Sequence, residues 1–511
     1  MKRDVIVIGA GIGGTTAAAL LQKAGLQTLL LDKNPRIGGS CSWYEKRGFH
    51  VDYGTHMFSR GAKGPLGQAL RSVGAAVEFR QTPNLSELRG PGISLVVPSA
   101  AWKLPLFCLE AVRQLRIPMR ELPHISRMFA DIFLMSPQKI EAWDERSIDE
   151  FISGYTDDPR LFGLLGFLLG LYFILPPWEC SAGESIYCLQ NMLRDNALSY
   201  PKGGAAAIPR AFVAALRRYG GECWTRARVE SLTRSGDGWR VTLRDGRELH
   251  AKTVVSTSSL PDLVDWIGPG KLPAAYGAVA AGVRKSYIAV QCKIALPRRR
   301  ETTGCLVGAY TPDPSFNPWT ISLDDYRTQF EHLDAGRVPP VVPIYCPIPT
   351  NFDASLGPPG TQLLTACAVA PTTDIARPED KHPTRRNDKR FKEALLAAME
   401  TLVPGCTKEA LFVDVMSTEG IASWIGKKHG PAVSTGQTPH QSGRNRPSVR
   451  SGLAGLYVAG DAAGGRGVGT ELACESAIEC AAAILADRRA AAAPSLEQLR
   501  RTAAPIAAVT A

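Results

Sequence analysis

Four residues near the start of the chain have the types and the spacing that bind a dinucleotide. Gly9, Gly11 and Gly14 form a GxGxxG pattern, and Asp32 follows 21 residues after Gly11. The first glycine permits a tight turn, the second lets the backbone approach a pyrophosphate, and the third lets a helix pack closely on a strand. The carboxylate of Asp32 would accept hydrogen bonds from ribose hydroxyls, which favours a free 2′-hydroxyl, as in FAD or NAD, over a 2′-phosphate.

The elements that must position these residues are visible in the same stretch. Residues 5–8 are a continuous apolar run, which predicts a buried parallel strand. A helix is expected over about 15–23, with its N-terminal end directed at the phosphates, and a second strand over 28–31 ends at Asp32. A glycine-rich turn without a ligand is the alternative. The spacing of strand, helix, strand and acid favours an α/β, Rossmann-like dinucleotide-binding domain.

A second glycine pair, Gly38-Gly39, follows the acid, and residues 51–54 read Val-Asp-Tyr-Gly. With these motifs the chain resembles the FAD-binding amine oxidase and phytoene desaturase superfamily, which has a glycine pair after the ribose acid and a hydrophobic-Asp-x-Gly turn beneath the flavin. The resemblance implies FAD as the cofactor and a glutathione-reductase-like fold. Ser40 stands where the family usually has Arg or Lys, so one phosphate contact would come from a hydroxyl and a backbone N–H. In this first part of the chain the implied FAD contacts are Gly9, Gly11, Gly13, Gly14, Asp32, Lys33, Gly38, Gly39, Ser40, Gly54, Thr55 and His56.

Three later segments extend the resemblance. Residues 200–204 lead into a predicted helix over 208–219 and then into alternating strands up to residue 256. In the family this stretch returns to the FAD domain, and the residue that matches Val229 meets the adenine through its backbone. Residues 352–360 are similar to a proline-rich turn common in phytoene desaturases and retinol saturases, from which Ala354 and Gly357 depart.

The third segment, near the end of the chain, combines a strand, a Gly460-Asp461 turn, a glycine loop over 464–469 and a helix expected over about 470–486. The resemblance implies that Asp461 holds the ribityl chain. It also implies that the helix start lies against the flavin pyrimidine edge, where the helix dipole stabilises negative charge. A purely structural βα unit is the alternative. The implied contacts here are Gly460, Asp461, Gly469, Thr470, Glu471 and Leu472.

A chain of 511 residues suggests about three domains by length alone. Because both ends of the chain carry cofactor motifs, we expect two interleaved domains instead. The FAD-binding domain would comprise 1–75, 197–270 and 425–487, an α+β substrate domain would comprise 76–196 and 271–424, and 488–511 would be a flexible tail.

An uncharged apolar run over 161–175 contains three glycines. A buried helix below the active site, a helix that lines a lipid tunnel or dips into a bilayer surface, and a transmembrane span are all open, although a span needs ~20 residues. Residues 102–107 mix apolar and basic types, with Arg113, Arg116, Arg120 and Arg127 downstream. They could dock on anionic lipid or form an ordinary solvated helix.

Composition excludes several other classes. The twelve cysteines have no CxxC pair and the eight histidines no metal-ligand spacing, so we expect no metal and a reducing compartment. Lys+Arg 59 against Asp+Glu 48 gives a net charge of +11, but the basic residues are dispersed without a nucleic-acid recognition motif. Without a convincing signal peptide, we expect a cytoplasmic protein, with peripheral contact at the inner face of the membrane left open.

Two side chains are candidates for catalysis. His56 follows the turn beneath the flavin, although a hydrogen-bonded structural histidine is the stronger interpretation. Glu471 begins the helix beside the flavin, where it is either a proton carrier or a partner of the helix dipole.

The leading hypothesis is an FAD-dependent oxidoreductase that moves hydride between flavin N5 and a long apolar isoprenoid or polyene, as a carotenoid-type desaturase, saturase or isomerase. In desaturation a quinone or dioxygen would accept the electrons, whereas saturation would draw them from a reduced donor, and both directions are open. The alternatives are a flavin amine oxidase acting on a small amine and a non-catalytic prenyl-lipid escort, against which the intact phosphate loop, Asp32 and Asp461 argue.

Overall fold

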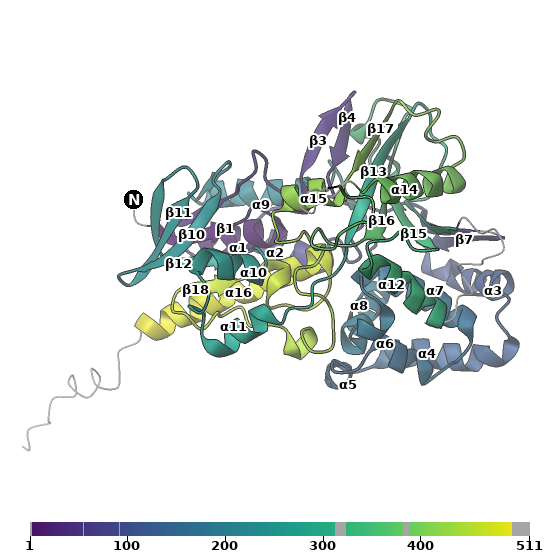
Figure 1. Cartoon of the computed structure of the whole chain (residues 1–511), viewed down its shortest axis with the longest axis horizontal. Helices are drawn as coiled ribbons and strands as arrows, with labels where there is room; N and C mark the ends of the chain where they lie inside the picture. Colours follow the sequence, from purple (N-terminus) through teal and green to yellow (C-terminus); the bar gives the residue numbers. More distant parts are fainter. Residues whose placement is uncertain (1–2, 55, 91, 312–322, 382–387, 493–511) are drawn as a thin grey trace, which may run out of the picture.

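The computed structural model of this protein describes residues 3–54, 56–90, 92–311, 323–381 and 388–492, and two seven-stranded sheets organise them (Figure 1). In the first sheet the strands β9, β2, β1, β12 and β18 run parallel, and β11 and β10 extend it antiparallel from β12. Their bounds are β9 (Glu222–Trp224), β2 (Thr28–Leu31), β1 (Arg3–Ile8), β12 (Glu248–Ser256), β18 (Leu456–Val458), β11 (Gly238–Leu243) and β10 (Val229–Ser235).

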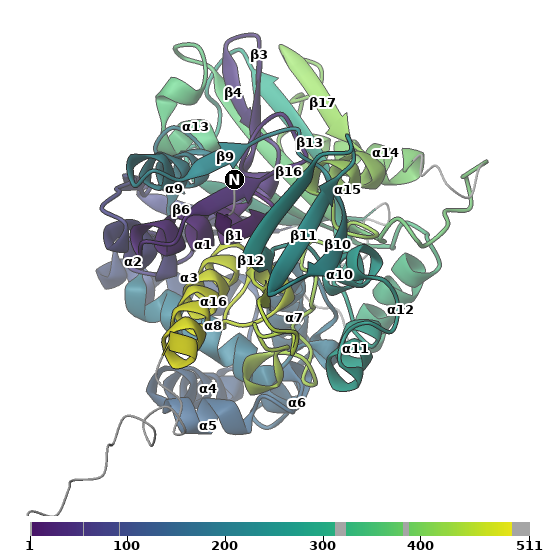
Figure 2. The ribbon, with the colours of Figure 1, turned by 90° about the vertical axis from the view of Figure 1, so that its left-hand side faces the viewer.

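Both faces of the first sheet are covered, which explains the continuous apolar run of β1. Val5 and Val7 pack into the core on the side of α1 (Ile12–Lys23), α9 (Ala207–Arg218) and α16 (Gly469–Ala492). Ile6 and Ile8 alternate with them and pack on the opposite side, with α10 (Leu260–Ile267) and residues of β10 and β11. Figure 2 shows α16 lying beside α1. The carboxyl ends of β1, β2, β12 and β18 therefore meet at one edge, where ligands bind in such sheets.

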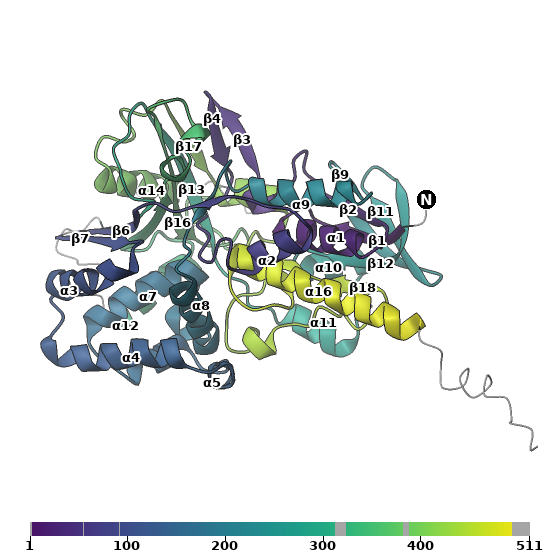
Figure 3. The ribbon, with the colours of Figure 1, turned by 180° about the vertical axis from the view of Figure 1, so that it is seen from behind.

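The second sheet is antiparallel except between β14 and β6. In spatial order it contains β17 (Phe412–Met416), β13 (Ile288–Leu296), β16 (Gln362–Ala370), β15 (Val342–Pro347), β14 (Cys305–Tyr310), β6 (Asn84–Gly90) and β7 (Ile93–Pro98). Helix α14 (Lys389–Leu402) packs on its strands. Below it in Figures 1 and 3 lies a helical layer of α3 (Leu104–Gln114), α4 (Leu122–Leu134), α5 (Pro137–Ala142), α6 (Ile148–Ser153), α7 (Pro159–Phe173), α8 (Ala182–Asp195) and α12 (Leu323–Asp334).

Several short elements connect the two parts. The hairpin β3 (Trp43–Lys46) and β4 (Phe49–Asp52) lies in the segment expected to belong to the FAD-binding domain, yet it packs on the second sheet. There the Tyr44 hydroxyl donates to Asp414 over 2.8 Å. The remaining elements are α2 (Pro65–Ser72), β5 (Phe79–Arg80), β8 (Tyr200–Pro201), α11 (Ala274–Ala281), α13 (Pro349–Phe352) and α15 (Thr418–Ile425).

Three expectations about local structure need correction or comment. Helix α1 begins at Ile12, three residues before the expected start, because the glycine loop itself enters the helix. Helix α16 continues to Ala492, so residues 488–492 are not a flexible tail; Arg488 pairs with Asp4 at 2.9 Å. The rest of the expected tail, 493–511, lies outside the described residues. Within the described part of the chain, no helix is long and apolar enough to span a membrane, and α7 has 15 residues.

Candidate active site

The first glycine loop has the geometry that its sequence pattern predicts. Gly9 has a φ of +101°, and a Cβ on it would lie 2.5 Å from Thr257 Oγ1. A Cβ on Gly14 would lie 1.8 Å from the carbonyl oxygen of Gly9, so only glycine allows α1 to approach β1 this closely. At Gly11 a Cβ would meet no atom within 4 Å. The start of α1 has no side-chain cap and no acid in its first turn, so its N–H groups suit a phosphate.

Asp32 is buried at the end of β2, beside that loop. Its two carboxylate oxygens accept hydrogen bonds from the backbone N–H groups of Ala10 and Asn34, each over 2.7 Å. Burial raises the pKa of this carboxyl more than these bonds lower it. Ala227 N–H donates to the Asp32 carbonyl over 2.8 Å, which brings the start of β10, and with it the buried Val229, to the ribose end of the expected site.

The Lys33 side chain, one of the predicted cofactor contacts, is held by backbone carbonyls in the structure. Its ammonium donates to the carbonyl oxygens of Ser423 over 2.6 Å and of Trp424 over 3.0 Å, at the C-terminal end of α15. A cation at a helix C-terminus is stabilised by the helix dipole. The Lys33 side chain therefore holds α15 against the ribose loop, and a contact with the cofactor through its ammonium would require these bonds to break.

The second glycine pair lies directly on the first loop. Gly38 N–H donates to the Ala10 carbonyl over 2.7 Å, and a Cβ on Gly39 would lie 3.3 Å from Gly11 Cα. Trp424 completes the contact, because its indole N–H donates to the Gly39 carbonyl over 3.1 Å while its ring stacks on Tyr53 with centroids 4.1 Å apart. Sequence reasoning missed Trp424, since nothing in the local sequence of α15 marks it as a site residue.

Residues 51–54 form the turn that is predicted to lie beneath the flavin, called the flavin turn below. Ser40 joins this turn to the glycine pair. The Ser40 carbonyl accepts hydrogen bonds from Gly54 N–H over 2.9 Å and from His56 Nε2 over 3.1 Å. A carbonyl oxygen can only accept, so Nε2 carries the hydrogen, and burial lowers the pKa of His56 and keeps the ring neutral. This geometry favours the structural interpretation of His56. Thr55 lies outside the described residues.

Two motifs that are distant in the sequence meet beneath this turn. The Tyr200 hydroxyl donates to the buried Asp52 carboxylate, and Ala205 N–H donates to the same carboxylate over 3.0 Å. Asp353 accepts from Gly203 N–H over 2.8 Å. The proline-rich turn at 352–360 thus supports the 200–204 loop and, through it, the Asp52 turn.

The carboxyl ends of β1, β2, β12 and β18 form one edge of the first sheet, called the cofactor edge below. The Gly460-Asp461 turn after β18 completes this edge. A Cβ on Gly13 would lie 2.9 Å from Gly460 Cα, so α1 and the turn after β18 touch through glycine backbone. The Asp461 carboxylate accepts from Lys427 Nζ and from Ser434, whose backbone N–H is 2.9 Å and whose hydroxyl is 3.0 Å away. Burial alone would raise the pKa of Asp461, but the Lys427 ammonium and the Ser434 bonds outweigh burial and hold it below its ordinary value.

Lys427 and Ser434 were not expected from the sequence. They belong to the irregular segment 427–446, whose polar residues include the fully buried Thr435 and Gln437. Gln437 bonds the Gly467 carbonyl, so the segment wraps the glycine loop before α16. A buried run of hydroxyl and amide side chains beside a charged turn indicates such a role, but burial is not visible in the sequence.

The same glycine loop is tied to the helical layer by buried charges. Arg466 pairs with Asp144, which is fully buried, and its Nε lies 3.3 Å from Glu184 of α8. Glu184 also accepts from the Gly467 N–H. Because the pairs are buried, they set the position of the loop from which α16 begins.

Glu471 is buried in the first turn of α16, where Gly469 leaves open space as Gly11 does. One carboxylate oxygen accepts from the Arg60 backbone N–H over 2.7 Å, and Ser59 forms a second hydrogen bond to the carboxylate. The Ser59 hydroxyl lies 3.2 Å from the Tyr172 hydroxyl at the end of α7. Burial raises the pKa of Glu471 to about 6, despite the lowering effect of Arg60. Thr470 and Leu472 flank it in the same turn.

Lys293 reaches the flavin turn from the opposite side. It stands in the middle of β13 with no exposed surface, and its ammonium lies 3.4 Å from the Gly54 carbonyl and 3.1 Å from Gln291 Oε1. Burial lowers its pKa to about 8. The sequence did not single out Lys293, because one lysine in an apolar strand resembles an ordinary surface lysine.

These features together define a class of protein. Two helix N-termini with open glycine positions, a buried acid beside each, and a turn at Gly54 that is hydrogen-bonded to Ser40 fit a dinucleotide that carries a flavin. Among the described residues, no group of histidines, cysteines or acids could hold a metal ion.

Comparison with known proteins identifies the family. Residues 12–485 match the flavin containing amine oxidoreductases, and the chain belongs to this family. Chloroplastic prolycopene isomerase from Arabidopsis thaliana is 23% identical over 95% of this chain and 83% of its own length. Phytoene dehydrogenase from Streptomyces griseus is 24% identical over 87% of both chains. The crystal structure of an oxidoreductase from Methanosarcina mazei superposes with a TM-score of 0.68 and 20% identity over 94% of this chain and 99% of that one. The protein is therefore an FAD-dependent oxidoreductase.

Proposed function

We propose that this flavoprotein acts on carbon–carbon bonds of a long apolar isoprenoid or polyene, as a carotenoid-type desaturase, saturase or isomerase. The substrate class rests on the similarity to prolycopene isomerase and phytoene dehydrogenase along most of the chain. FAD, when bound, supplies a hydride acceptor or donor at N5. The cofactor would be held by the helix starts at Gly11 and Gly469 and by the carboxylates of Asp32 and Asp461.

The observation that carries the chemistry is the buried Glu471 carboxyl, linked through Ser59 to the Tyr172 hydroxyl. Hydride removal from an allylic carbon must be matched by loss of a proton from the neighbouring carbon, and hydride addition by gain of one. A carboxyl with a pKa of about 6 exchanges a proton readily near neutral pH. Burial raises the pKa of Tyr172 well above its ordinary value, so its hydroxyl keeps a proton and can relay one between Ser59 and the substrate.

Other residues orient and shield this centre. His56 holds the Ser40 carbonyl and so keeps the flavin turn in place. Lys293 places a buried ammonium beside the Gly54 carbonyl, where its positive charge would stabilise negative charge on a reduced flavin held by this turn. Phe58 and Tyr200 pack edge to face beneath the turn and exclude water from it.

The test is anaerobic reduction of the flavin by a panel of polyenes, retinoids and amines, followed by absorbance near 450 nm. For the reverse direction, photoreduced enzyme is mixed with the same polyenes and the products are separated by chromatography. We expect polyenes or retinoids to change the flavin spectrum or to be converted. Bleaching by amines alone would refute the proposed substrate class and favour an amine oxidase.

We further propose that the electrons pass to a quinone or to dioxygen, and that the protein meets its apolar substrate by peripheral contact with a membrane. The rate at which each acceptor reoxidises the reduced flavin, measured by stopped flow, tests the identity of the electron acceptor. A rate with a short-chain quinone that exceeds the rate with dioxygen would identify the quinone as the acceptor.

A further inference from the structure

Helix α8 of the helical layer contacts the surroundings of the α16 start from both of its own ends. Near its N-terminal end, the buried Glu184 accepts a hydrogen bond from the Gly467 N–H, just before α16 begins. At its C-terminal end, Asp195 pairs with Arg60, whose Nε lies 2.6 Å from Asp195 Oδ2. The Arg60 backbone N–H is the donor to Glu471. Helix α8 therefore holds two segments that contact the first turn of α16.

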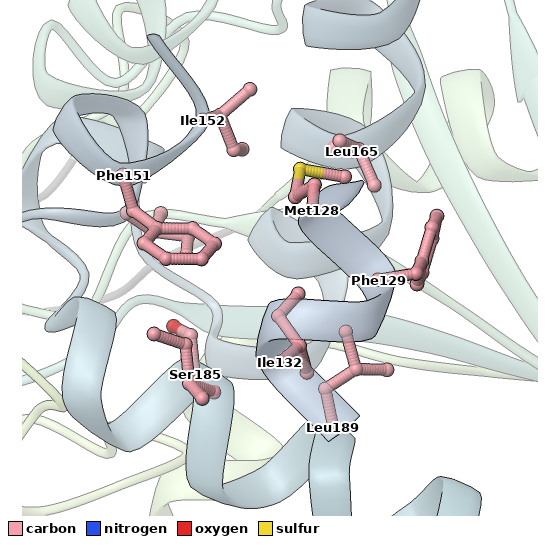
Figure 4. A pocket seen from close by; sticks show the side chains of 10 residues that line it. Met128, Phe129, Ile132, Phe151, Ile152, Leu165, Ser185 and Leu189 are labelled. Carbon is pink, nitrogen blue, oxygen red and sulfur yellow. The ribbon is translucent and has the colours of Figure 1, made fainter. Parts of the chain in front are cut away.

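The two acids lie on one face of α8, and the side turned away from them is packed into the helical layer. Glu184 and Asp195 are about three helical turns apart, so their side chains point in nearly the same direction. Ser185 and Leu189 point elsewhere and line a small apolar pocket with Ile132 of α4 and other apolar residues of α4, α6 and α7 (Figure 4). Apolar packing thus fixes the helix from which Asp195 reaches Arg60.

Arg60 is held in two directions, by its backbone and by its side chain. Its carbonyl oxygen accepts hydrogen bonds from the N–H groups of Lys63 and Gly64, so the chain turns tightly after it. A Cβ on Gly64 would lie 2.6 Å from the Arg60 Cβ, so the glycine leaves the space that this side chain needs. The Arg60 side chain is only 18% exposed. The turn and α8 together therefore set the direction of the guanidinium.

Asp195 stands where a helix ordinarily disfavours an acid. It is the last residue of α8, and the carbonyl oxygens at a helix C-terminus carry partial negative charge. Two cations compensate, because the Arg60 guanidinium binds the carboxylate and Lys63 Nζ donates to the Asp195 carbonyl over 2.6 Å. An acid that departs from a local rule and is paired beside the proposed proton carrier indicates a role beyond the stability of its own helix.

The charges of this pair act on Glu471 with opposite signs. Burial makes the largest contribution and raises the pKa of Glu471 to about 6, while the Arg60 guanidinium lowers this pKa and the Asp195 carboxylate raises it. The other titratable or charged side chains around the carboxyl and Arg60 are Tyr172, Glu184, Tyr187, Cys188, Arg466 and Glu475. Removal of either member of the pair leaves the effect of the other on Glu471 uncompensated.

We propose that Arg60 and Asp195 are positioning residues for proton transfer by Glu471, and that through them helix α8 fixes this carboxyl beside Ser59 and Tyr172. The proposal rests on the proposed function, in which Glu471 exchanges the proton that leaves or enters the substrate. Arg60 acts through its backbone N–H and its charge, and Asp195 acts through Arg60. Because Ser59 directly precedes Arg60, a shift of Arg60 would disturb both hydrogen bonds of the Glu471 carboxylate.

The first measurement is an infrared titration of the flavin-loaded, substrate-free protein. The carbonyl band of the protonated Glu471 carboxyl is the band that Glu471→Gln removes, and its midpoint is followed with pH. Arg60→Met should raise this midpoint by about one pH unit, because a cation that favours the carboxylate is lost. Asp195→Asn should lower it, by up to about one unit, because Arg60 then acts without its compensating charge. A merely structural contact would not move the midpoint in opposite directions.

The second measurement is the pH dependence of flavin reduction by the substrate in stopped flow. The rise of this rate through about pH 6 should move in each variant in the same direction as the infrared midpoint. Arg60→Lys keeps a cation and should restore the midpoint of the wild type. If Arg60→Met does not fold, Asp195→Asn decides alone, since an unchanged or raised midpoint in this variant overturns the proposal.

The matched control is another partly buried pair of an arginine and an acid. Arg89 Nη2 lies 2.8 Å from Glu301 Oε2 at the second sheet, and the two side chains are 26% and 13% exposed. Arg89→Met and Glu301→Gln should leave both midpoints unchanged. Shifts of the same sign in Arg60→Met and Asp195→Asn overturn the proposal, and so do equal shifts in the control variants.

Failure of this proposal and failure of the proposed function are distinguishable. Opposite shifts of the infrared midpoint without any response of the flavin to polyenes would support the positioning pair and refute the substrate class. Flavin reduction by polyenes that depends on Glu471, but keeps its pH profile in the Arg60 and Asp195 variants, would refute the positioning pair alone.

Discussion

The cofactor edge and the helical layer are built by opposite means. At the cofactor edge, contacts are made by backbone: glycines at 9, 13, 14 and 39 let chain segments approach to distances that a side chain would disturb, and Gly11 leaves space open for a ligand. On the helical layer, α3 and α4 present large apolar side chains to the outside. The first region admits no added side chain at Gly9, Gly13 or Gly14, whereas the second presents large side chains to the outside.

This difference explains why the two regions differ in how far sequence alone predicts them. A position that only glycine can occupy leaves a fixed spacing in the sequence, because the backbone geometry it serves is fixed. An exposed apolar face is visible in the sequence only as an apolar composition, and the same composition is equally typical of a buried core helix. The comparison also predicts that substitutions will have very different effects in the two regions.

The largest effect is expected at the tightest glycine. Gly14→Ala places a methyl group 1.8 Å from the Gly9 carbonyl, so the first βαβ unit cannot close, and we expect insoluble or flavin-free protein. Gly11→Ala meets no atom within 4 Å and should fold with a loss of no more than about 1 kcal/mol, yet bind FAD more weakly. Soluble yield and the ratio of 450 to 280 nm absorbance measure both. Equal behaviour of the two variants would contradict the distinct roles of these glycines.

The next effect is expected at the ion pair of Lys427 and Asp461. Lys427→Met leaves the Asp461 carboxylate buried without its cation, and the free energy of unfolding should fall by about 3–5 kcal/mol near neutral pH. Lys428→Met, which removes only an exposed pair with Asp265, should cost less than about 1 kcal/mol. Denaturant titration measures both.

The pH dependence of that pair has a defined sign. In the wild type the pKa of Asp461 is lowered, so its stabilisation is present above the ordinary value of 3.8 and is lost as the pH falls through the lowered value. In Lys427→Met the effect of burial dominates, so the pKa of Asp461 rises. Protonation of Asp461 then removes the unpaired buried charge and reduces the destabilisation of the variant. The difference between the two proteins should therefore shrink as the pH is lowered from neutral, and a constant difference would exclude this explanation.

The next effect, on the rate of flavin reduction rather than on stability, is expected at the proposed proton carrier. Glu471→Gln should lower the rate of flavin reduction by substrate roughly 10²–10⁴-fold while FAD stays bound. In the wild type this rate should rise with pH through about 6, because the ionised carboxylate accepts the proton, and the variant should lack this rise. Glu475→Gln, one turn along α16, is the matched control. An unchanged pH profile in Glu471→Gln would remove Glu471 from the chemistry.

Lys293 should contribute a pH-dependent term to stability. Its pKa is lowered by burial from 10.5 to about 8, so between these values the unfolded chain binds more protons than the folded one. Stability relative to Lys293→Met should therefore rise with pH across this window, by roughly 1 kcal/mol per pH unit. Unfolding midpoints of both proteins across this range test it, and parallel curves would show that Lys293 does not titrate in the folded state.

The smallest effect is expected on the exposed helical face. Leu109→Ala should change the free energy of unfolding by no more than about 0.5 kcal/mol, because Leu109 is 67% exposed. Leu30→Ala in the first sheet removes a fully buried side chain and should cost about 2–5 kcal/mol. Should Leu109→Ala cost as much as Leu30→Ala, the Leu109 side chain is packed in solution and is not exposed.

Much of the cofactor edge was predictable. The strand at 28–31, the conformations of Gly9 and Gly14, and the meeting of both chain ends all follow from motif spacing, and the family and cofactor predicted from them are confirmed. The predicted residue contacts with FAD stay predictions. The structure gives Lys33 another partner and His56 a structural bond, because neither side chain's direction is encoded in the spacing of its neighbours.

The sequence by itself determined where backbone must approach backbone, since only glycine permits such contact and its positions are therefore visible in one dimension. The tertiary structure alone decided which charges share a buried space. Lys427 meets Asp461 across 34 residues, Arg466 meets Asp144 across 322, and Lys293 reaches Gly54 across 239. Pairing of this kind depends on how two sheets and a helical layer close on one another, and the burial that lowers the pKa of Lys293 exists only after that closure.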